Sequence, residues 1–123
     1  MVIALCAAMV GACGGAQRSD PPPQQAAGPA ADGAELVRTR GCVSCHSVDG
    51  SGGAGPTLQG IWDSQVELAD GSSVTVDRAY VARSLREPRA QIVEGFNGVM
   101  PAYDLERDEI DALVAYLRTL DAP

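Results

Sequence analysis

Residues 41–47 read "GCVSCHS", which places Cys42 and Cys45 three residues apart and puts His46 directly after the second cysteine. His46 is the only histidine of a 123-residue chain that holds four cysteines. Two thiols beside an imidazole are a set of side chains that binds metals or prosthetic groups. The stretch therefore predicts a binding site, which further residues must complete.

Three kinds of site use such a cluster. A thioredoxin-like redox pair needs a βαβ pattern around the C-x-x-C motif, and none is visible. A structural zinc site needs four ligands, and an exported chain offers only this cluster and, beyond a long leader, Cys13. A c-type haem needs two thiols for thioether bonds to the porphyrin and an adjacent imidazole for the iron. We predict one haem c, bound covalently through Cys42 and Cys45, with His46 as an iron ligand.

The second iron ligand is predicted by elimination. The chain contains no other histidine and no lysine. Met1 and Met9 lie in a segment predicted to be removed on export, which leaves Met100 as the remaining thioether. Pro101 biases Met100 toward an extended conformation, which suits a side chain presented from a loop. We therefore expect His/Met ligation of the iron by His46 and Met100, and the alternative is a five-coordinate iron open to small ligands.

The N-terminus predicts export. Residues 2–12 are apolar, too few for a bilayer span of roughly 20 residues but suited to a signal peptide. "VGAC", residues 10–13, resembles a bacterial lipobox, in which the cysteine is lipidated. We expect a lipoprotein-type signal peptide over 1–12, a lipidated Cys13 that opens a flexible tether rich in Pro, Ala and Gln over 13–32, and a folded domain over 33–121. An ordinary cleaved signal peptide, with Cys13 incidental, is the alternative.

Composition limits the remaining function classes. Aromatic residues make up 4% of the chain, so a domain of this size needs a cofactor or another staple to complete its core. The net charge is −7, and all nine basic residues are arginine. This acidic balance argues against nucleic acid as a partner, because binding it needs a concentrated basic face.

The periodicity of the folded part is mainly helical. A short helix with Leu36 and Val37 on one side is expected to carry the cysteines near its end. Residues 65–76 predict a β-hairpin around Asp70-Gly71. A helix capped by Asp77 is expected to run to about residue 87, before a proline, and a last helix is expected over about 106–120. The chain between these two helices is expected to be mostly irregular.

At the level of motifs, residues 33–120 resemble a class I cytochrome c. The resemblance rests on "GAELVRTRGCVSCHSVDGSGGAGPTLQGIW", "VMPAY" and "LERDEIDALVAYLRTL". The stretch "VELADGSSVTVDRAYVARSLREPRAQIVEGF" is similar to the cytochrome c domain fused to subunit II of bacterial haem–copper cytochrome c oxidases. The resemblance implies an all-α fold around the haem, with the hairpin of residues 65–76 as a small insert.

The resemblance also implies contacts within the domain. The first and last helices are expected to cross, with Gly33 and Ala34 against Tyr116. The Pro56 carbonyl is expected to accept a hydrogen bond from the ring of the histidine ligand. Glu106 replaces the Ser or Thr that usually caps the last helix, so that helix start is expected to fray. Trp62, Arg40 and Arg89 are candidates to bind the haem propionates.

These expectations predict a non-enzymatic carrier of single electrons in a respiratory chain. It would be tethered by lipid to the periplasmic face of a membrane, and its partners would be redox proteins. A quinol-oxidising complex or a dehydrogenase would donate electrons, and a terminal oxidase would accept them. The alternatives are a permanent cytochrome subunit of a larger oxidoreductase complex and a haem peroxidase or sensor with open iron.

Overall fold

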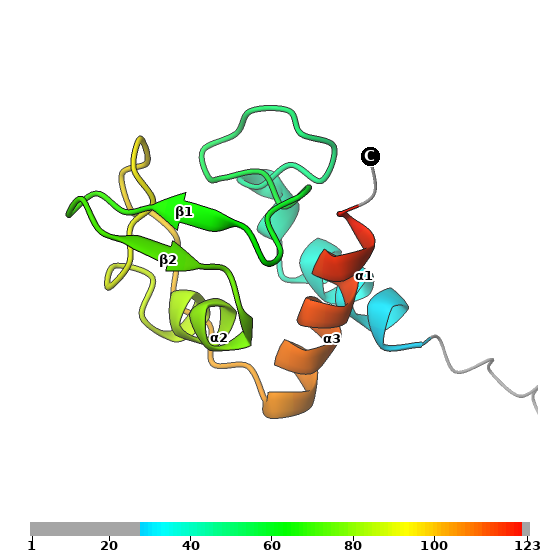
Figure 1. The fold of residues 1–123 in the computed structure, drawn as a ribbon. Coiled ribbons are helices and arrows are strands. Elements are labelled where there is room, and N and C mark those ends of the chain that lie inside the picture. The colour runs from blue at the N-terminus through cyan, green and yellow to red at the C-terminus, as the bar shows by residue number, and fades with distance from the viewer. Residues whose placement is uncertain (1–27, 122–123) are drawn as a thin grey trace, which may run out of the picture.

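The structure is a computed structural model that describes residues 28–121 (Figure 1). Its elements are α1 (Pro29–Thr39), the 3-10 turn η1 (Cys42–Ser44), β1 (Gln65–Glu67), β2 (Ser73–Thr75), α2 (Arg78–Arg86) and α3 (Arg107–Thr119). The predicted helical fold with one small β-hairpin is confirmed. The predicted signal peptide, the lipobox cysteine Cys13 and most of the tether lie outside the described residues.

Helices α1 and α3 cross in close contact (Figure 1). The crossing is centred on Gly33, where a Cβ would lie 2.1 Å from the Ala112 carbonyl oxygen and 2.7 Å from Tyr116 Cβ. Only a residue without a side chain lets the two backbones approach this closely. The expected contact of Gly33 with Tyr116 is thus present, and Ala34 beside it is half-buried.

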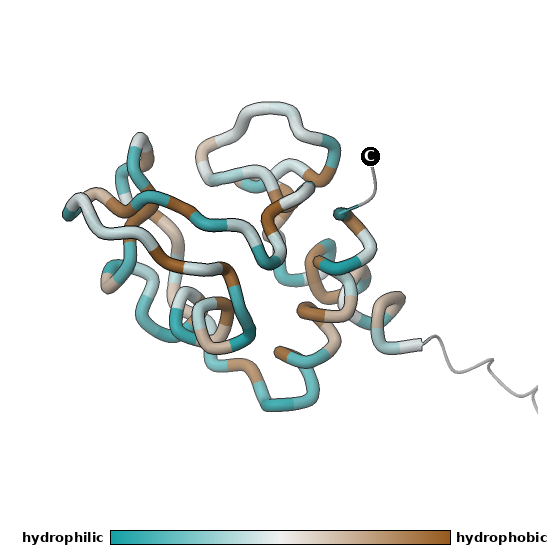
Figure 2. The backbone as a smooth tube through the Cα atoms, viewed as in Figure 1, coloured by the Kyte–Doolittle hydropathy of each residue, from teal (hydrophilic) through white to brown (hydrophobic). Residues whose placement is uncertain are grey.

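The main apolar cluster lies between α1, α2 and α3. In Figure 2 hydrophobic and hydrophilic positions alternate along these helices. The buried members of the cluster are Val37, Leu85, Leu105, Ile110 and Leu113. Each of the three helices contributes at least one of them, so the cluster holds the helices around the space that the next subsection describes.

The first helix differs from its expected bounds at both ends. It begins at Pro29, a residue type suited to the first helical turn, and so includes residues assigned to the tether. It ends before Gly41, whose φ of 76° is left-handed. A left-handed glycine at this position terminates a helix. Cys42 therefore begins η1, a separate turn, and Cys45 directly follows it, so the expectation that the first helix carries the cysteines is wrong.

The β-hairpin forms where it was expected. Gln65 pairs with Thr75 and Glu67 with Ser73 in an antiparallel register. Gly71 has a φ of 83° in the turn. The hairpin is fixed to the chain after α2, because the Ala69 N–H donates to the Ile92 carbonyl oxygen at 2.8 Å. It therefore covers the segment that leads to Met100.

The ends of α2 and α3 follow local sequence signals. The Asp77 carboxylate accepts a hydrogen bond from the Tyr80 N–H at 2.8 Å and caps α2, which ends two residues before Pro88. At the start of α3, the Glu109 carboxylate accepts from the Glu106 N–H at 2.9 Å. This bond satisfies a donor at the helix terminus despite the missing Ser or Thr. Within residues 28–121, no helix is long and apolar enough to cross a membrane.

The crossing of α1 and α3 can be tested by Gly33→Ala. The added Cβ must displace the α3 backbone, so we expect the free energy of unfolding to fall by about 1–3 kcal/mol. Gly52→Ala is the matched control, because a Cβ at this exposed glycine meets nothing within 4 Å. Denaturant unfolding of the haem-loaded protein measures both variants. A Gly33→Ala protein as stable as the Gly52→Ala protein would contradict the close approach.

Candidate cofactor site

A cavity of about 410 Å³ lies between the helices and the loops that connect them. Its size is that of a site for a small molecule or cofactor, for which roughly 300–1,000 Å³ is usual. Most of its wall is apolar and comes from α1, α2, α3, the hairpin end and two loops. The sequence-predicted cluster and its expected partners all line this one cavity: Cys42, Cys45, His46, Pro56 and Met100.

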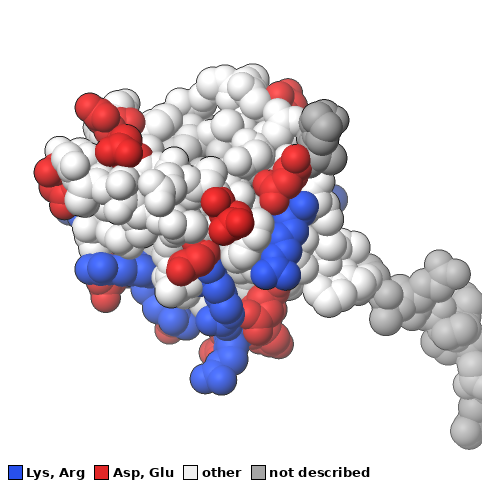
Figure 3. Space-filling view, in the orientation of Figure 1, with Lys and Arg blue, Asp and Glu red and all other residues white. Residues whose placement is uncertain are grey.

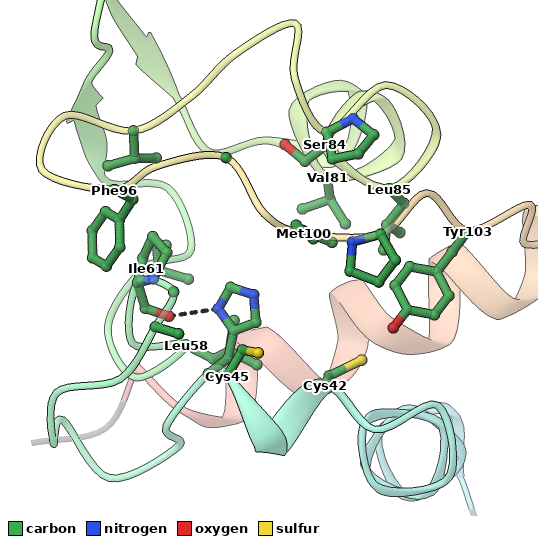
Figure 4. Close-up of a pocket in the computed structure, with 18 of the residues that line it drawn as sticks. Cys42, Cys45, Leu58, Ile61, Val81, Ser84, Leu85, Phe96, Met100 and Tyr103 are labelled. Carbon is green, nitrogen blue, oxygen red and sulfur yellow. Dashed lines mark hydrogen bonds between the residues drawn. The ribbon is translucent and has the colours of Figure 1, made fainter.

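The imidazole of His46 is held in one orientation. Its Nδ1 lies 2.7 Å from the Pro56 carbonyl oxygen, the contact marked by the dashed line in Figure 4. Since a carbonyl oxygen can only accept, Nδ1 carries the hydrogen and Nε2 keeps a lone pair. An imidazole oriented in this way is a suitable metal ligand.

A glycine lets the loop pack directly on this ring. At Gly55 a Cβ would lie 2.6 Å from His46 Cε1, so any larger residue would push the ring or the loop away. The Gly55 N–H also donates to the Cys45 carbonyl oxygen at 2.9 Å, which anchors the loop to the end of η1. These backbone contacts fold the short segment after the histidine so that Pro56 lies beside the imidazole.

Cys42 begins η1 and Cys45 directly follows it, and both thiols lie on the side of the cavity opposite Met100 (Figure 4). Both are free and half-buried. Burial raises the pKa of the Cys42 thiol. A reactive redox cysteine requires a lowered pKa, so this environment disfavours the thioredoxin-like interpretation. Among residues 28–121, no group of three or more His, Cys, Asp and Glu side chains could hold a metal ion, which also disfavours zinc.

Met100 is presented by the irregular chain between α2 and α3, as expected. The loop is tied to α2 by the Tyr103 N–H, which donates to the Leu85 carbonyl oxygen at 2.7 Å. It is tied to the end of α1 by the Tyr103 hydroxyl, which donates to the Arg40 carbonyl oxygen at 3.2 Å. The Met100 side chain packs against the apolar cluster. Two hydrogen bonds therefore hold the thioether on the wall that faces the cysteines.

The three candidate propionate ligands do not line this cavity. The Arg40 guanidinium donates instead to Glu109 at 2.9 Å. The Arg118 guanidinium lies over the Trp62 ring, and its Cζ is 4.7 Å from the centroid of that ring. Arg89 is exposed and lines a separate shallow depression beside Pro101. These side chains have partners or solvent elsewhere, so the structure does not bring them to the site.

Sequence reasoning missed two polar residues in the cavity wall, Ser84 and Gln91. The Ser84 hydroxyl and the Gln91 side-chain carbonyl oxygen are buried and have no hydrogen-bond partner. One signal for Ser84 was available in the sequence, because it lies three residues after Val81 and next to Leu85 on the inner face of a helix. A polar residue at that position of an apolar stripe points to a ligand or a buried partner.

The donor set and the wall fit a haem. Two free thiols and an imidazole with an available Nε2 lie on one side, a thioether lies on the other, and most side chains between them are apolar. The two unpartnered polar atoms are consistent with a group that fills the space and supplies hydrogen-bond partners. Neither zinc nor a reactive dithiol explains the methionine opposite the cysteines.

Comparisons with known proteins agree with this site. The model of the cytochrome c family matches residues 30–121. Cytochrome c2 iso-1 of Magnetospirillum fulvum is 29% identical in an alignment of 89 residues, which covers 64% of this chain and 90% of that protein. The Magnetospirillum molischianum protein of the same name is 30% identical over 64% of this chain and 89% of its own length.

A larger protein also shares the domain. Cytochrome c oxidase subunit 2 of Alkalihalophilus pseudofirmus is 33% identical over 72% of this chain, which spans 25% of that protein. The resemblance thus extends both to cytochrome c2 and to the cytochrome c region of an oxidase subunit. The chain belongs to the cytochrome c family of electron carriers, and its domain implies a covalently bound haem c at Cys42 and Cys45.

Proposed function

We propose that this protein transfers single electrons through one haem c whose iron is ligated by His46 and Met100. The observation that carries the proposal is the position of the two side chains in one apolar cavity. The hydrogen bond to Pro56 fixes the imidazole, and the bond between Tyr103 and Leu85 fixes the methionine loop. Both side chains are therefore held at the cavity by hydrogen bonds to the backbone.

This arrangement suits electron transfer better than catalysis. The haem, when bound, supplies a one-electron redox couple. With both His46 and Met100 bound to the iron, no position would remain for a substrate, and the fixed loops would present the same two ligands in both oxidation states. A thioether ligand and an apolar environment favour the reduced state relative to two histidines. A peroxidase or sensor would need Met100 to leave the iron.

The surface beside the site supports docking to a redox partner. Val43, between the two cysteines, is 47% exposed and Val99, next to Met100, is 65% exposed. Within the described residues these are the two exposed large hydrophobic side chains. They flank the two ligand-bearing segments, so a partner that covers them comes close to the haem.

The charge distribution on the surface indicates which charges a partner should carry. From residue 41 to residue 77 the chain carries five acidic residues and no basic one. In Figure 3 the arginines gather below, over α2 and the start of α3, and the upper part of this face is nearly free of them. A partner that docks beside the cysteines should therefore present basic residues, and the rate of association should fall as salt rises.

We further propose a place for the carrier in a respiratory chain. A lipid at Cys13 would tether the domain to the periplasmic face of a membrane, where a quinol-oxidising complex or a dehydrogenase would reduce it. A terminal oxidase would accept its electrons, which the similarity to an oxidase subunit supports. The same similarity favours a second candidate, a cytochrome subunit bound permanently in a larger complex. Size-exclusion chromatography of a mild detergent extract separates the two.

The ligand set is tested by Met100→Ala and Met100→His. We expect the oxidised wild-type protein to show a methionine–iron charge-transfer band, which both variants lose. Met100→Ala should also bind carbon monoxide, because it opens the iron. Met100→His should lower the midpoint potential by at least ~60 mV, a tenfold change in the ratio of oxidised to reduced protein.

Val99→Ala is the control for the ligand experiment, since it changes the neighbouring exposed side chain and should keep the band. A wild-type spectrum without the band, together with carbon monoxide binding that displaces no ligand, would show that Met100 is not an iron ligand. The open-iron alternative would then replace the carrier.

The anchor is tested by Cys13→Ser in a bacterial host that attaches haem c. We expect the wild-type protein in the membrane fraction and the variant in the soluble periplasmic fraction, because stable anchoring requires the acyl chains. Cys6→Ser, which changes a cysteine inside the predicted signal peptide, should leave the protein on the membrane. Intact mass of the mature wild-type protein without acyl chains would contradict the proposal.

A further inference from the structure

Asn97 and Gly98 form an asparagine–glycine pair in the loop that presents Met100. Asn97 is the only asparagine of the chain, and it is exposed. In such a pair the backbone nitrogen of the glycine can attack the side-chain amide carbon of the asparagine, because glycine has no side chain to hinder the approach. Asparagine is a thermolabile residue. The pair is therefore a candidate for spontaneous chemical modification.

The backbone around this pair leaves the attacking nitrogen free. Within the described part of the chain, residues 97–102 neither donate nor accept a backbone–backbone hydrogen bond. The nearest such bonds are donated by the N–H groups of Phe96, at 3.1 Å, and Tyr103, at 2.7 Å. Phe96 and Met100 both line the cavity, and Figure 4 shows the chain that joins them. The Gly98 nitrogen thus lies in a segment that is held only at its two ends.

A pair of related chemistry in the hairpin turn, Asp70-Gly71, is protected at both groups. The Gly71 N–H donates to the Leu68 carbonyl oxygen at 2.9 Å. The Asp70 carboxylate accepts a hydrogen bond from the Ser72 N–H, also at 2.9 Å. The two groups that would have to react are therefore bound elsewhere, which distinguishes this turn from the loop before Met100.

Gly98 is required by the fold, so the labile pair cannot be removed by changing the glycine. Its φ of 64° is left-handed. A Cβ at this position would lie 2.8 Å from Ile92 Cδ1. Any other residue would be strained by the backbone angle and by this contact. Asn97 is exposed and meets no such restriction, so it is the residue to change in an experiment.

We propose that Asn97-Gly98 is a site of spontaneous deamidation and that the isoaspartate formed there releases Met100 from the haem iron. The Gly98 nitrogen forms a bond to Asn97 Cγ, the bond from Cγ to Nδ2 breaks, and ammonia leaves with the proton of the Gly98 amide. Water then opens the cyclic imide. Its attack at Cγ gives aspartate, and its attack at the backbone carbonyl carbon gives isoaspartate, whose main chain runs through Cβ and Cγ.

The isoaspartate lengthens the main chain three residues before Met100. Consecutive Cα atoms normally lie about 3.8 Å apart, and the additional carbon increases this step. Because the segment is held at Phe96 and Tyr103, the added length must be accommodated between them, where Met100 lies. The release of the thioether rests on the proposed ligation by Met100, whereas the deamidation itself does not. Deamidation would therefore limit the working life of the carrier.

Ageing of the haem-loaded protein tests the proposal. The protein is incubated in mildly alkaline buffer under argon, which prevents oxidation of methionine. Peptide mass spectrometry should show the peptide of Asn97 gaining the mass that converts an amide into a carboxyl group, with isoaspartate as a product. The methionine–iron band should fall by the same fraction as isoaspartate rises. Carbon monoxide should bind to that fraction, because its iron has lost the thioether.

Two variants of the exposed residue are the controls. Asn97→Gln moves the amide carbon one methylene farther from the Gly98 nitrogen, so the five-membered imide cannot form. It should keep its mass and its band over the same time. Asn97→Asp, measured when freshly purified, carries the charge of the product without the additional main-chain atom. It should retain the band, which separates the effect of chain length from that of charge.

Each contrary outcome overturns a defined statement. Aged wild-type protein without the mass gain refutes the deamidation site, and isoaspartate with an undiminished band refutes the release of Met100. Equal loss of the band in aged Asn97→Gln, or its absence from fresh Asn97→Asp, refutes the role of the isoaspartate. These results leave the proposed ligation standing, because the fresh wild-type protein shows the band. Fresh wild-type protein without the band refutes the ligation and, with it, the release.

Discussion

The cavity between the helices is the constraint on which the rest of the structure depends. The described part of the chain buries ten hydrophobic side chains, few for a domain that must hold three helices together around a space of about 410 Å³. An apolar group that fills this space completes the core. The close crossing at Gly33, the hairpin cover and the tied methionine loop all enclose the same volume. Folding and cofactor binding are therefore coupled in this protein.

The enclosed site and the surface have different roles: the site positions side chains, and the surface orients a partner. Inside, backbone carbonyls and N–H groups set the positions of the two proposed iron ligands: the Pro56 carbonyl orients His46, and the Leu85 carbonyl holds the loop of Met100. Outside, residues 41–77 carry five acidic residues and no basic one, and Val43 and Val99 are exposed, whereas the arginines gather over α2 and the start of α3 (Figure 3). An uneven distribution of charge orients a partner before contact.

Local signals predicted the elements well because each acts over a few residues. Asp77 marks the start of α2 and the proline after that helix marks its end. Asp70-Gly71 forms the turn of the hairpin. The first helix was predicted less well. Its apolar pattern gave no reason to stop before the cysteines, and a left-handed Gly41 ended it there. The sequence could not place the candidate propionate ligands, because the ion pair of Arg40 with Glu109 joins residues distant in the chain.

The sequence by itself determined which side chains are proposed to bind the haem, because one histidine and two neighbouring cysteines leave few combinations. It also determined that the domain is mainly helical, since the apolar period is local. The tertiary structure alone decided which side chains share the cavity. That arrangement depends on contacts between distant segments, such as Tyr103 with Leu85, which no local pattern encodes. For the same reason only the fold showed that Ser84, a polar residue on the inner face of α2, lines the cavity without a hydrogen-bond partner.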